Sequence, residues 1–147
     1  MNRLLILKKV RIGCLAIVLL AVFMGCSEDK KILGGTCWKV TDMKFSENSE
    51  MLYLFVSDAD IWLVINNYGE FALQSLDDGI SGRVKVGNSK INFKEKSTST
   101  DGFCNPFMKV CADLLINKIN HYEMSGDNLV LTGKKGEVIN LVLIVRL

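Results

Sequence analysis

The strongest constraint on the fold is a series of short apolar segments that recur about every 8–12 residues from residue 36 onward. Turn-forming Gly, Asn, Asp and Ser residues separate these segments, and the sole proline, Pro106, lies outside them. Connections this short join antiparallel neighbours, because a parallel crossover needs about a dozen residues or more. The spacing therefore predicts an α+β, mostly β fold: a curved antiparallel sheet or partial barrel with one helix.

Alternation of apolar and polar residues marks the strands. In Gly82–Val86, for example, two valines share one face while Arg83 and Lys85 share the other. Among the aromatic residues, we expect Tyr53, Phe55, Trp62 and Phe71 in the core rather than on a stacking surface. The other expected strands are Cys37–Phe45, Met51–Val56, Ile61–Ile65, Glu70–Leu73, Lys90–Phe93, Tyr122–Met124, Leu129–Thr132 and Val138–Val145.

One helix is expected after a polar loop over Glu95–Gly102. Asn105 can cap its start, and Pro106 suits its first position because no backbone donor is needed there. Apolar residues then follow at helical spacing, which predicts a single buried face. These residues are Phe107, Val110, Cys111, Leu114, Leu115 and Ile119.

Residues 1–25 differ from the rest of the chain. They contain four basic residues and no acid, and Ile12–Gly25 carries no charge at all. A basic start followed by a short apolar run is typical of a secretory signal peptide, whereas a membrane-spanning helix needs about 20 residues. Without this segment, 14 basic and 16 acidic residues remain, so the net charge changes from +2 to −2. We therefore expect no nucleic-acid partner.

Phe23-Met24-Gly25-Cys26 resembles a lipobox, where bacteria attach acyl chains such as palmitate to a cysteine that becomes the first mature residue. The departure is Phe23, where an aliphatic residue is usual. We expect a lipoprotein signal peptide over residues 1–25, lipidation of Cys26, and a flexible tether over residues 26–35. The alternatives are ordinary secretion and an uncleaved anchor. The expected location is the cell envelope, at the periplasmic or surface face of the outer membrane.

Three of the five cysteines belong to the expected domain: Cys37, Cys104 and Cys111. In an oxidising compartment they allow one disulfide and one remaining thiol. Within one helix, Cys104 and Cys111 would lie about 10 Å apart, whereas a disulfide needs about 4.4–6.8 Å between Cα atoms. This distance argues against Cys104–Cys111 unless Cys104 lies in a bend. The preferred pair is Cys37–Cys104, with Cys111 as a buried thiol on the apolar helix face.

No group of residues predicts catalysis, a metal site or a cofactor. His121 is the sole histidine and follows the helix, where an exposed position is the simplest interpretation. The acidic pairs and the lysine pair occur in expected turns, and their spacing matches no complete calcium loop. These pairs are Asp58/Asp60, Asp77/Asp78 and Lys134/Lys135.

From Trp38 to Leu147 the chain resembles the META, or HslJ-like, domain. Trp38 opens the first strand after a small-residue linker, and a strand that begins at Gly82 leads into a hairpin. Thr-x-x-x-Cys precedes the helix, and a Tyr strand later turns into a Leu-x-Leu strand. The matching segments are Ile91-Asn92-Phe93, Thr100-Asp101-Gly102-Phe103-Cys104, Tyr122 and Gly126-Asp127-Asn128-Leu129-Val130-Leu131.

The sequence departs from the family before and after Gly82. Asp77 and Asp78 stand near a position where the family often has Gly-Cys-Asn, and Val84 replaces a customary Tyr. The resemblance therefore implies that Cys104 lacks one usual disulfide partner, which Cys37 or Cys111 would replace. It also implies a small envelope-associated domain with no agreed enzymatic activity and links to stress tolerance and secretion.

Three functions follow as hypotheses. The first is a non-catalytic lipoprotein, held at the membrane by its lipid anchor, that binds another envelope protein or serves in stress. The second is a lipocalin-like binder of a small apolar molecule, since a curved sheet can enclose a cavity. The third, a hydrolase, is disfavoured because one histidine and no polar cluster leave little for catalysis.

Overall fold

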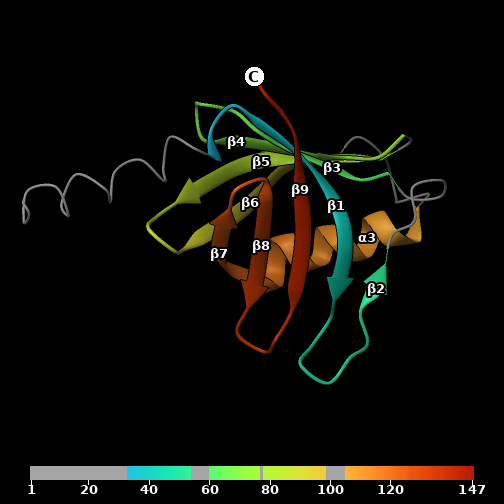
Figure 1. Ribbon diagram of the computed structural model, residues 1–147. Coiled ribbons are helices and arrows are strands. Elements are labelled where there is room, and N and C mark those ends of the chain that lie inside the picture. Colours follow the sequence, from blue (N-terminus) through green and yellow to red (C-terminus); the bar gives the residue numbers. More distant parts are fainter. Residues whose placement is uncertain (1–32, 54–59, 77, 99–104) are drawn as a thin grey trace, which may run out of the picture.

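The structure is a computed structural model that describes residues 33–53, 60–76, 78–98 and 105–147 (Figure 1). Alternating burial along the strands places one face of the sheet in the core and the other toward solvent. The elements are β1 (Thr36–Lys44), β2 (Leu52–Tyr53), β3 (Trp62–Ile65), β4 (Glu70–Gln74), β5 (Gly79–Val86), β6 (Ile91–Thr98), α3 (Pro106–Asp113), the π-helical turn η2 (Leu114–Lys118), β7 (Ile119–Ser125), β8 (Asn128–Gly133) and β9 (Val138–Arg146).

The described strands form one sheet in the order β6-β5-β4-β3-β1-β9-β8-β7, and β2 pairs with β1 beside β3. Every pairing is antiparallel. The first strand, β1, lies at the centre and pairs with the last strand, β9, along nearly its whole length. The predicted α+β fold with a curved antiparallel sheet and one α-helix is confirmed.

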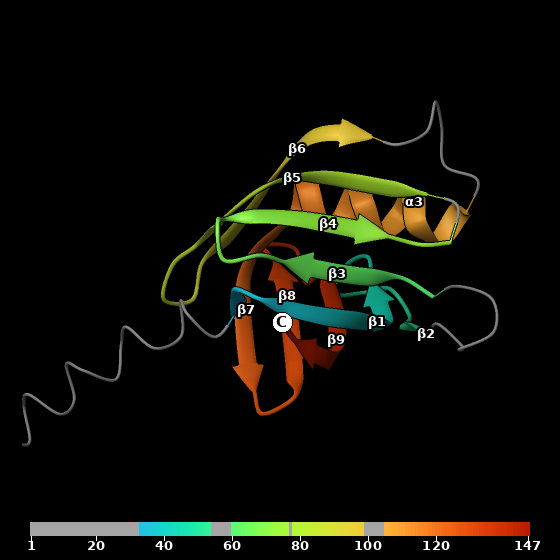
Figure 2. The ribbon, with the colours of Figure 1, turned by 90° about the horizontal axis from the view of Figure 1, so that it is seen from above.

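The sheet curls until its two edge strands meet at one end. Lys90, at the start of β6, forms an isolated bridge with His121 of β7. Tyr122 donates its backbone N–H to Ser89 O at 2.9 Å and its hydroxyl to Gly87 O at 2.8 Å. Figure 2 shows β6 diverging from the other edge farther along, which leaves a half-barrel.

The helix α3 lies across the concave side of this half-barrel (Figures 1 and 2). Asn105 caps it as predicted, since its side-chain oxygen accepts from Phe107 N at 2.9 Å. Met108 and Cys111 face the sheet and are fully buried with Trp38 and other strand residues. Each fully buried large side chain contributes about 1.5–3 kcal/mol to the free energy of unfolding. The side chains packed between α3 and the sheet therefore supply most of the stability.

Several predicted boundaries are wrong. The strand expected from Gly82 already begins at Gly79 as β5. Glu95–Thr98 was expected in a loop but continues β6, because Thr98 pairs with Ile80 of β5. The polar residues there are exposed on an edge strand, so their polarity does not prevent pairing. Ile119 was expected on the helix but begins β7, since the helix widens into η2 and ends at Lys118.

The expected core position of Trp62 is wrong, and the expected strand over 51–56 is only partly described. Trp62 is half-buried on the outer face of β3, because its neighbours Ile61 and Leu63 take the core positions. Phe71 is in the core as predicted, while the side chains of Tyr53 and Phe55 lie outside the described part of the chain. Of the expected strand over 51–56, the described part pairs at Leu52 and Tyr53 with β1.

The residue Leu33 lies within the segment expected as a tether, yet it is fully buried in the core. Its carbonyl accepts from Thr36 Oγ1 at 2.6 Å, and the same hydroxyl accepts from Trp38 Nε1 at 2.6 Å. The folded domain therefore includes residues 33–35.

Candidate functional site

The outer face of the sheet carries two adjoining depressions of about 360 Å³ and 290 Å³, both open to solvent. They share Ala72 of β4 and Ser81 of β5, which are cross-strand partners with short side chains. We call the combined depression the outer groove. Its remaining lining residues are Gln74, Ser75, Leu76, Asp78, Gly79, Ile80 and Ser97 at one end and Val64, Asn66, Glu70, Phe71, Gly82 and Lys96 at the other.

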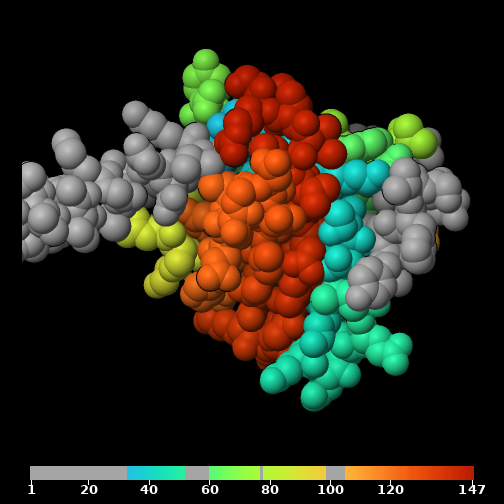
Figure 3. All heavy atoms as spheres, viewed as in Figure 1, coloured from blue at the N-terminus to red at the C-terminus, as the bar shows by residue number. Residues whose placement is uncertain are grey.

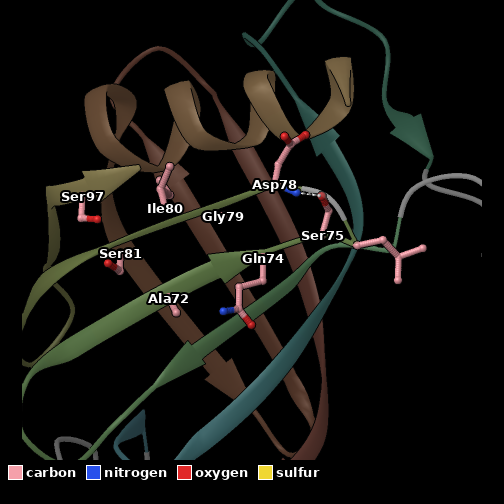
Figure 4. A pocket seen from close by; sticks show the side chains of 9 residues that line it. Ala72, Gln74, Ser75, Asp78, Gly79, Ile80, Ser81 and Ser97 are labelled. Carbon is pink, nitrogen blue, oxygen red and sulfur yellow. Dashed lines mark hydrogen bonds between the residues drawn. The ribbon is translucent and has the colours of Figure 1, made fainter. Parts of the chain in front are cut away.

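The groove exists because long side chains flank a row of short ones. Ala72 pairs with Val64 on one side and with Ser81 on the other, and Ser81 pairs with Ser97. Figure 4 shows the side chain of Gln74 on this face, while Ile80 points toward α3. The inner residues of these strands are in the core, so the groove rests on a rigid floor.

The two carboxylates near the groove make structural contacts. Asp78 is 3% exposed, and its Oδ2 accepts from the backbone N–H of Asn105 at 2.8 Å. Glu70 accepts from Asn66 Nδ2 at 2.9 Å in the β3–β4 turn. The groove therefore presents mainly hydroxyl, amide and apolar groups, which suits contact with another surface.

Basic side chains border the groove on the β5–β6 side. Arg83 and Lys94 are exposed cross-strand partners, and Lys96 follows on the same edge strand. Like charges directly opposite each other destabilise a sheet. Glu70 of β4 lies opposite Arg83 on its other side and offsets part of this cost. The three exposed cations make the basic border a candidate for recognition of an acidic surface.

Two of the three predicted disulfide candidates, Cys37 and Cys111, lie within the described residues and differ in burial. Cys37 is half-buried on β1, and desolvation raises the pKa of its thiol. Cys111 is fully buried in α3, and desolvation raises the pKa of its thiol to about 12. Both are thiols in the structure, while Cys104 and the lipidation candidate Cys26 lie outside the described residues. The pairing with Cys104 stays a prediction.

His121 is exposed on β7, and its Nδ1 lies 2.6 Å from Asn120 Oδ1. Asp60 forms an ion pair with Lys39 Nζ at 2.7 Å, whereas Asp58 and Asp77 lie outside the described residues. Within the described ranges, no group of three His, Cys, Asp or Glu side chains lies close enough to hold a metal ion.

The lysine pair Lys134/Lys135 is exposed in the β8–β9 turn, as expected. The neighbouring Glu137 is 3% exposed and accepts from Lys135 N at 2.8 Å. Sequence reasoning missed the buried positions of Glu137 and Asp78, since acids in turns are usually solvated.

Side chains of the helical segment fill much of the concave side of the described sheet, which disfavours the lipocalin-like hypothesis. Met108, Cys111 and Leu115 of α3 and η2 occupy this side with exposures of 0–1%. A further depression of about 520 Å³, open to solvent, lies at the end of the half-barrel beside the β3–β4 turn, and its lining includes the core residues Ile65 and Val84. No described helix is long and apolar enough to cross a bilayer.

A strongly curled antiparallel sheet with one capped helix on its concave side defines a small α+β domain of the half-barrel class. The chain belongs to the META domain family, which matches residues 31–144. No curated protein gives a significant sequence match.

Several solved structures share the fold, among them the following two. One is an NMR structure of a protein from Burkholderia xenovorans, with a TM-score of 0.59, 14% identity and coverage of 80% of this chain and 87% of that chain. The other is the crystal structure of a DUF4847 family protein from Bacteroides vulgatus ATCC 8482. It has a TM-score of 0.59 and 12% identity, and the match covers 77% of this chain and 95% of that chain. At these identities the likeness concerns the fold alone.

Proposed function

We propose that the chain is a lipid-anchored protein of the bacterial cell envelope whose META domain binds another envelope protein and performs no catalysis. The observation that carries the binding role is the outer groove. It is open, floored by Ala72 and Ser81, and bordered by the exposed cations Arg83 and Lys94. These features favour a partner with an acidic surface. A role in stress tolerance, which the family resemblance implies, is compatible with such a partner.

The binding role is tested by photo-crosslinking in intact cells. A photoreactive residue replaces Ser81, which is exposed on the groove floor, and in a control it replaces Glu123, which is exposed on β7. We expect a reproducible protein adduct from position 81 and none from position 123. Loss of that adduct in R83E/K94E would support electrostatic recognition. The same adducts from both positions, or none from position 81, would refute the groove as the binding surface.

The anchor is tested by the intact mass of the protein extracted from membranes. We expect the mass of a chain that starts at Cys26 and carries acyl groups. Cys26→Ala should leave the domain in the soluble fraction, because each buried acyl methylene contributes about 0.8 kcal/mol to membrane binding. A leader that stays attached, or a variant that stays on the membrane, would contradict the anchor.

A further inference from the structure

Exposed apolar side chains gather at the end of the domain where residues 33–35 enter it. Six large apolar side chains are exposed in the described part of the chain, and four of them lie at this end. They are Tyr68 at 90%, Ile144 at 53%, Val145 at 45% and Leu147 at 77% exposure. We call these four residues the tether-end patch.

Hydrogen bonds and strand pairing bring the patch together. Leu147 donates its backbone N–H to Gly35 O at 2.6 Å, and Val145 pairs with Cys37 at the start of β1. Gly34 lies against Asn67, the neighbour of Tyr68, since a Cβ on Gly34 would approach Asn67 Oδ1 to 2.7 Å. In Figure 3 the turn around Tyr68, drawn green, and the red end of β9 lie together at the top of the molecule.

The length of the preceding chain limits how far this end can lie from a lipid anchor. Six residues separate Cys26 from the buried Leu33, and the seven Cα–Cα steps between these two residues span at most about 25 Å when the chain is fully extended. An anchor at Cys26 therefore keeps this end of the domain within about 25 Å of the anchored residue. A protein partner on the patch would have to fit within that distance, between the domain and the membrane.

We propose that the tether-end patch rests in the interfacial region of the membrane, so that the lipid anchor and the protein surface bind the bilayer together. This inference depends on the proposed anchor at Cys26. Tyr suits such a position, because its ring is apolar while its hydroxyl stays with the headgroups. The aliphatic residues Ile144 and Val145 add apolar area that water would otherwise cover.

The orientation leaves the opposite end of the domain away from the membrane. β1 runs from Thr36 to Lys44, a distance of about 26 Å at 3.3 Å per residue. Phe45 follows at its far end and is 41% exposed. It therefore provides a matched aromatic control for Tyr68.

The test uses the full lipidated chain, reconstituted into phosphatidylcholine–phosphatidylglycerol vesicles with brominated acyl chains, which quench nearby tryptophan. Tyr68→Trp and Phe45→Trp are compared with the parent protein, which contributes Trp38 and Trp62 to every sample. We expect the added emission of Tyr68→Trp to shift to shorter wavelength and to be quenched. The emission of Phe45→Trp should match that in unbrominated vesicles.

The outcomes separate the patch from the anchor. If the protein floats with the vesicles but Tyr68→Trp is quenched no more than Phe45→Trp, the patch is refuted and the anchor stands. If the chain with intact Cys26 does not float, the anchor is refuted and this orientation with it. Tyr68 is almost fully exposed in a turn, so its replacement leaves the core unchanged.

Discussion

The buried carboxylate of Asp78 holds the start of α3 through a contact that spans 27 residues of sequence: Asn105 donates its backbone N–H to Asp78 Oδ2 at 2.8 Å. Asp78 lies directly before β5, and Asn105 caps the helix with its own side chain. A negative charge near a helix N-terminus also interacts favourably with the helix dipole. Asp78 therefore fixes the helix to the sheet beside the outer groove.

Replacement of Asp78 should weaken this attachment. Because a buried N–H loses a charged acceptor, Asp78→Ala should lower the free energy of unfolding by about 2 kcal/mol. Asp78→Asn keeps an acceptor oxygen and should lower it less. Urea denaturation followed by circular dichroism measures both values. Equal losses for the two variants would show that the acceptor does not matter.

Gly82 is a position where any side chain collides with the backbone of β6. A Cβ there would lie 1.9 Å from Lys94 O and 2.8 Å from Lys94 C, beside the bulge between Ser81 and Gly82. Gly82→Ala should therefore lower the free energy of unfolding by about 3 kcal/mol or more.

Gly87→Ala is the control for this substitution, since its Cβ would meet nothing closer than Lys90 O at 3.5 Å. Its effect should stay within about 1 kcal/mol in either direction. Thermal unfolding of both variants measures the difference in stability between them. A Gly82→Ala protein as stable as Gly87→Ala would mean that β5 and β6 do not approach each other as described.

The hydroxyl of Thr36 joins Leu33 to Trp38 within the core. Thr36→Val keeps the shape but leaves the indole N–H without its acceptor, which should cost about 2 kcal/mol of stability. Thr36→Ser keeps the hydroxyl and should cost about 1 kcal/mol through the lost methyl group. In a double-mutant cycle with Trp38→Phe, the effects should be less than additive. Additive effects would argue that the hydrogen bond contributes nothing.

Cys111 should be inert toward thiol reagents in the folded protein, because it is fully buried and the pKa of its thiol is about 12. After reduction, iodoacetamide at pH 8 should label Cys37 first and Cys111 only in denaturant. Peptide mass spectrometry reports each site. Labelling of Cys111 at the rate of Cys37 in native protein would contradict its burial.

The same thiol makes stability depend on pH at the alkaline end. Its pKa is raised from an ordinary value of 9.0 to about 12 in the fold, so the folded state retains a proton that the unfolded state loses. This contribution is complete below pH 9 and disappears as the pH rises toward 12. Cys111→Ala should therefore flatten the fall in stability over that range. An unchanged slope would show that other groups account for it.

Local patterns in the sequence were sufficient to predict most of the helices and strands. The alternation in Gly82–Val86 and the cap at Asn105 correctly predicted a strand and a helix start, because each depends on residues a few positions apart. The same reasoning failed for Glu95–Thr98, where an exposed edge strand tolerates polar residues on both sides. It also placed Ile119 on a helix that ends one residue earlier.

The outer groove and the tether-end patch could not be read from the sequence, because each combines residues that are distant along the chain. The groove depends on the register that sets Ala72 beside Ser81 and Ser81 beside Ser97. The patch depends on β9 returning to the start of β1.

By itself, the sequence determined that this protein is a mostly β domain with one helix, since periodicity, turn residues and caps act over short stretches of chain. Only the tertiary structure decided which polar residues are buried, such as Asp78 and Glu137, and which apolar residues stay outside, such as Tyr68 and Ile144. Burial depends on which strands become neighbours, and that choice minimises the free energy of the whole chain rather than of any single segment.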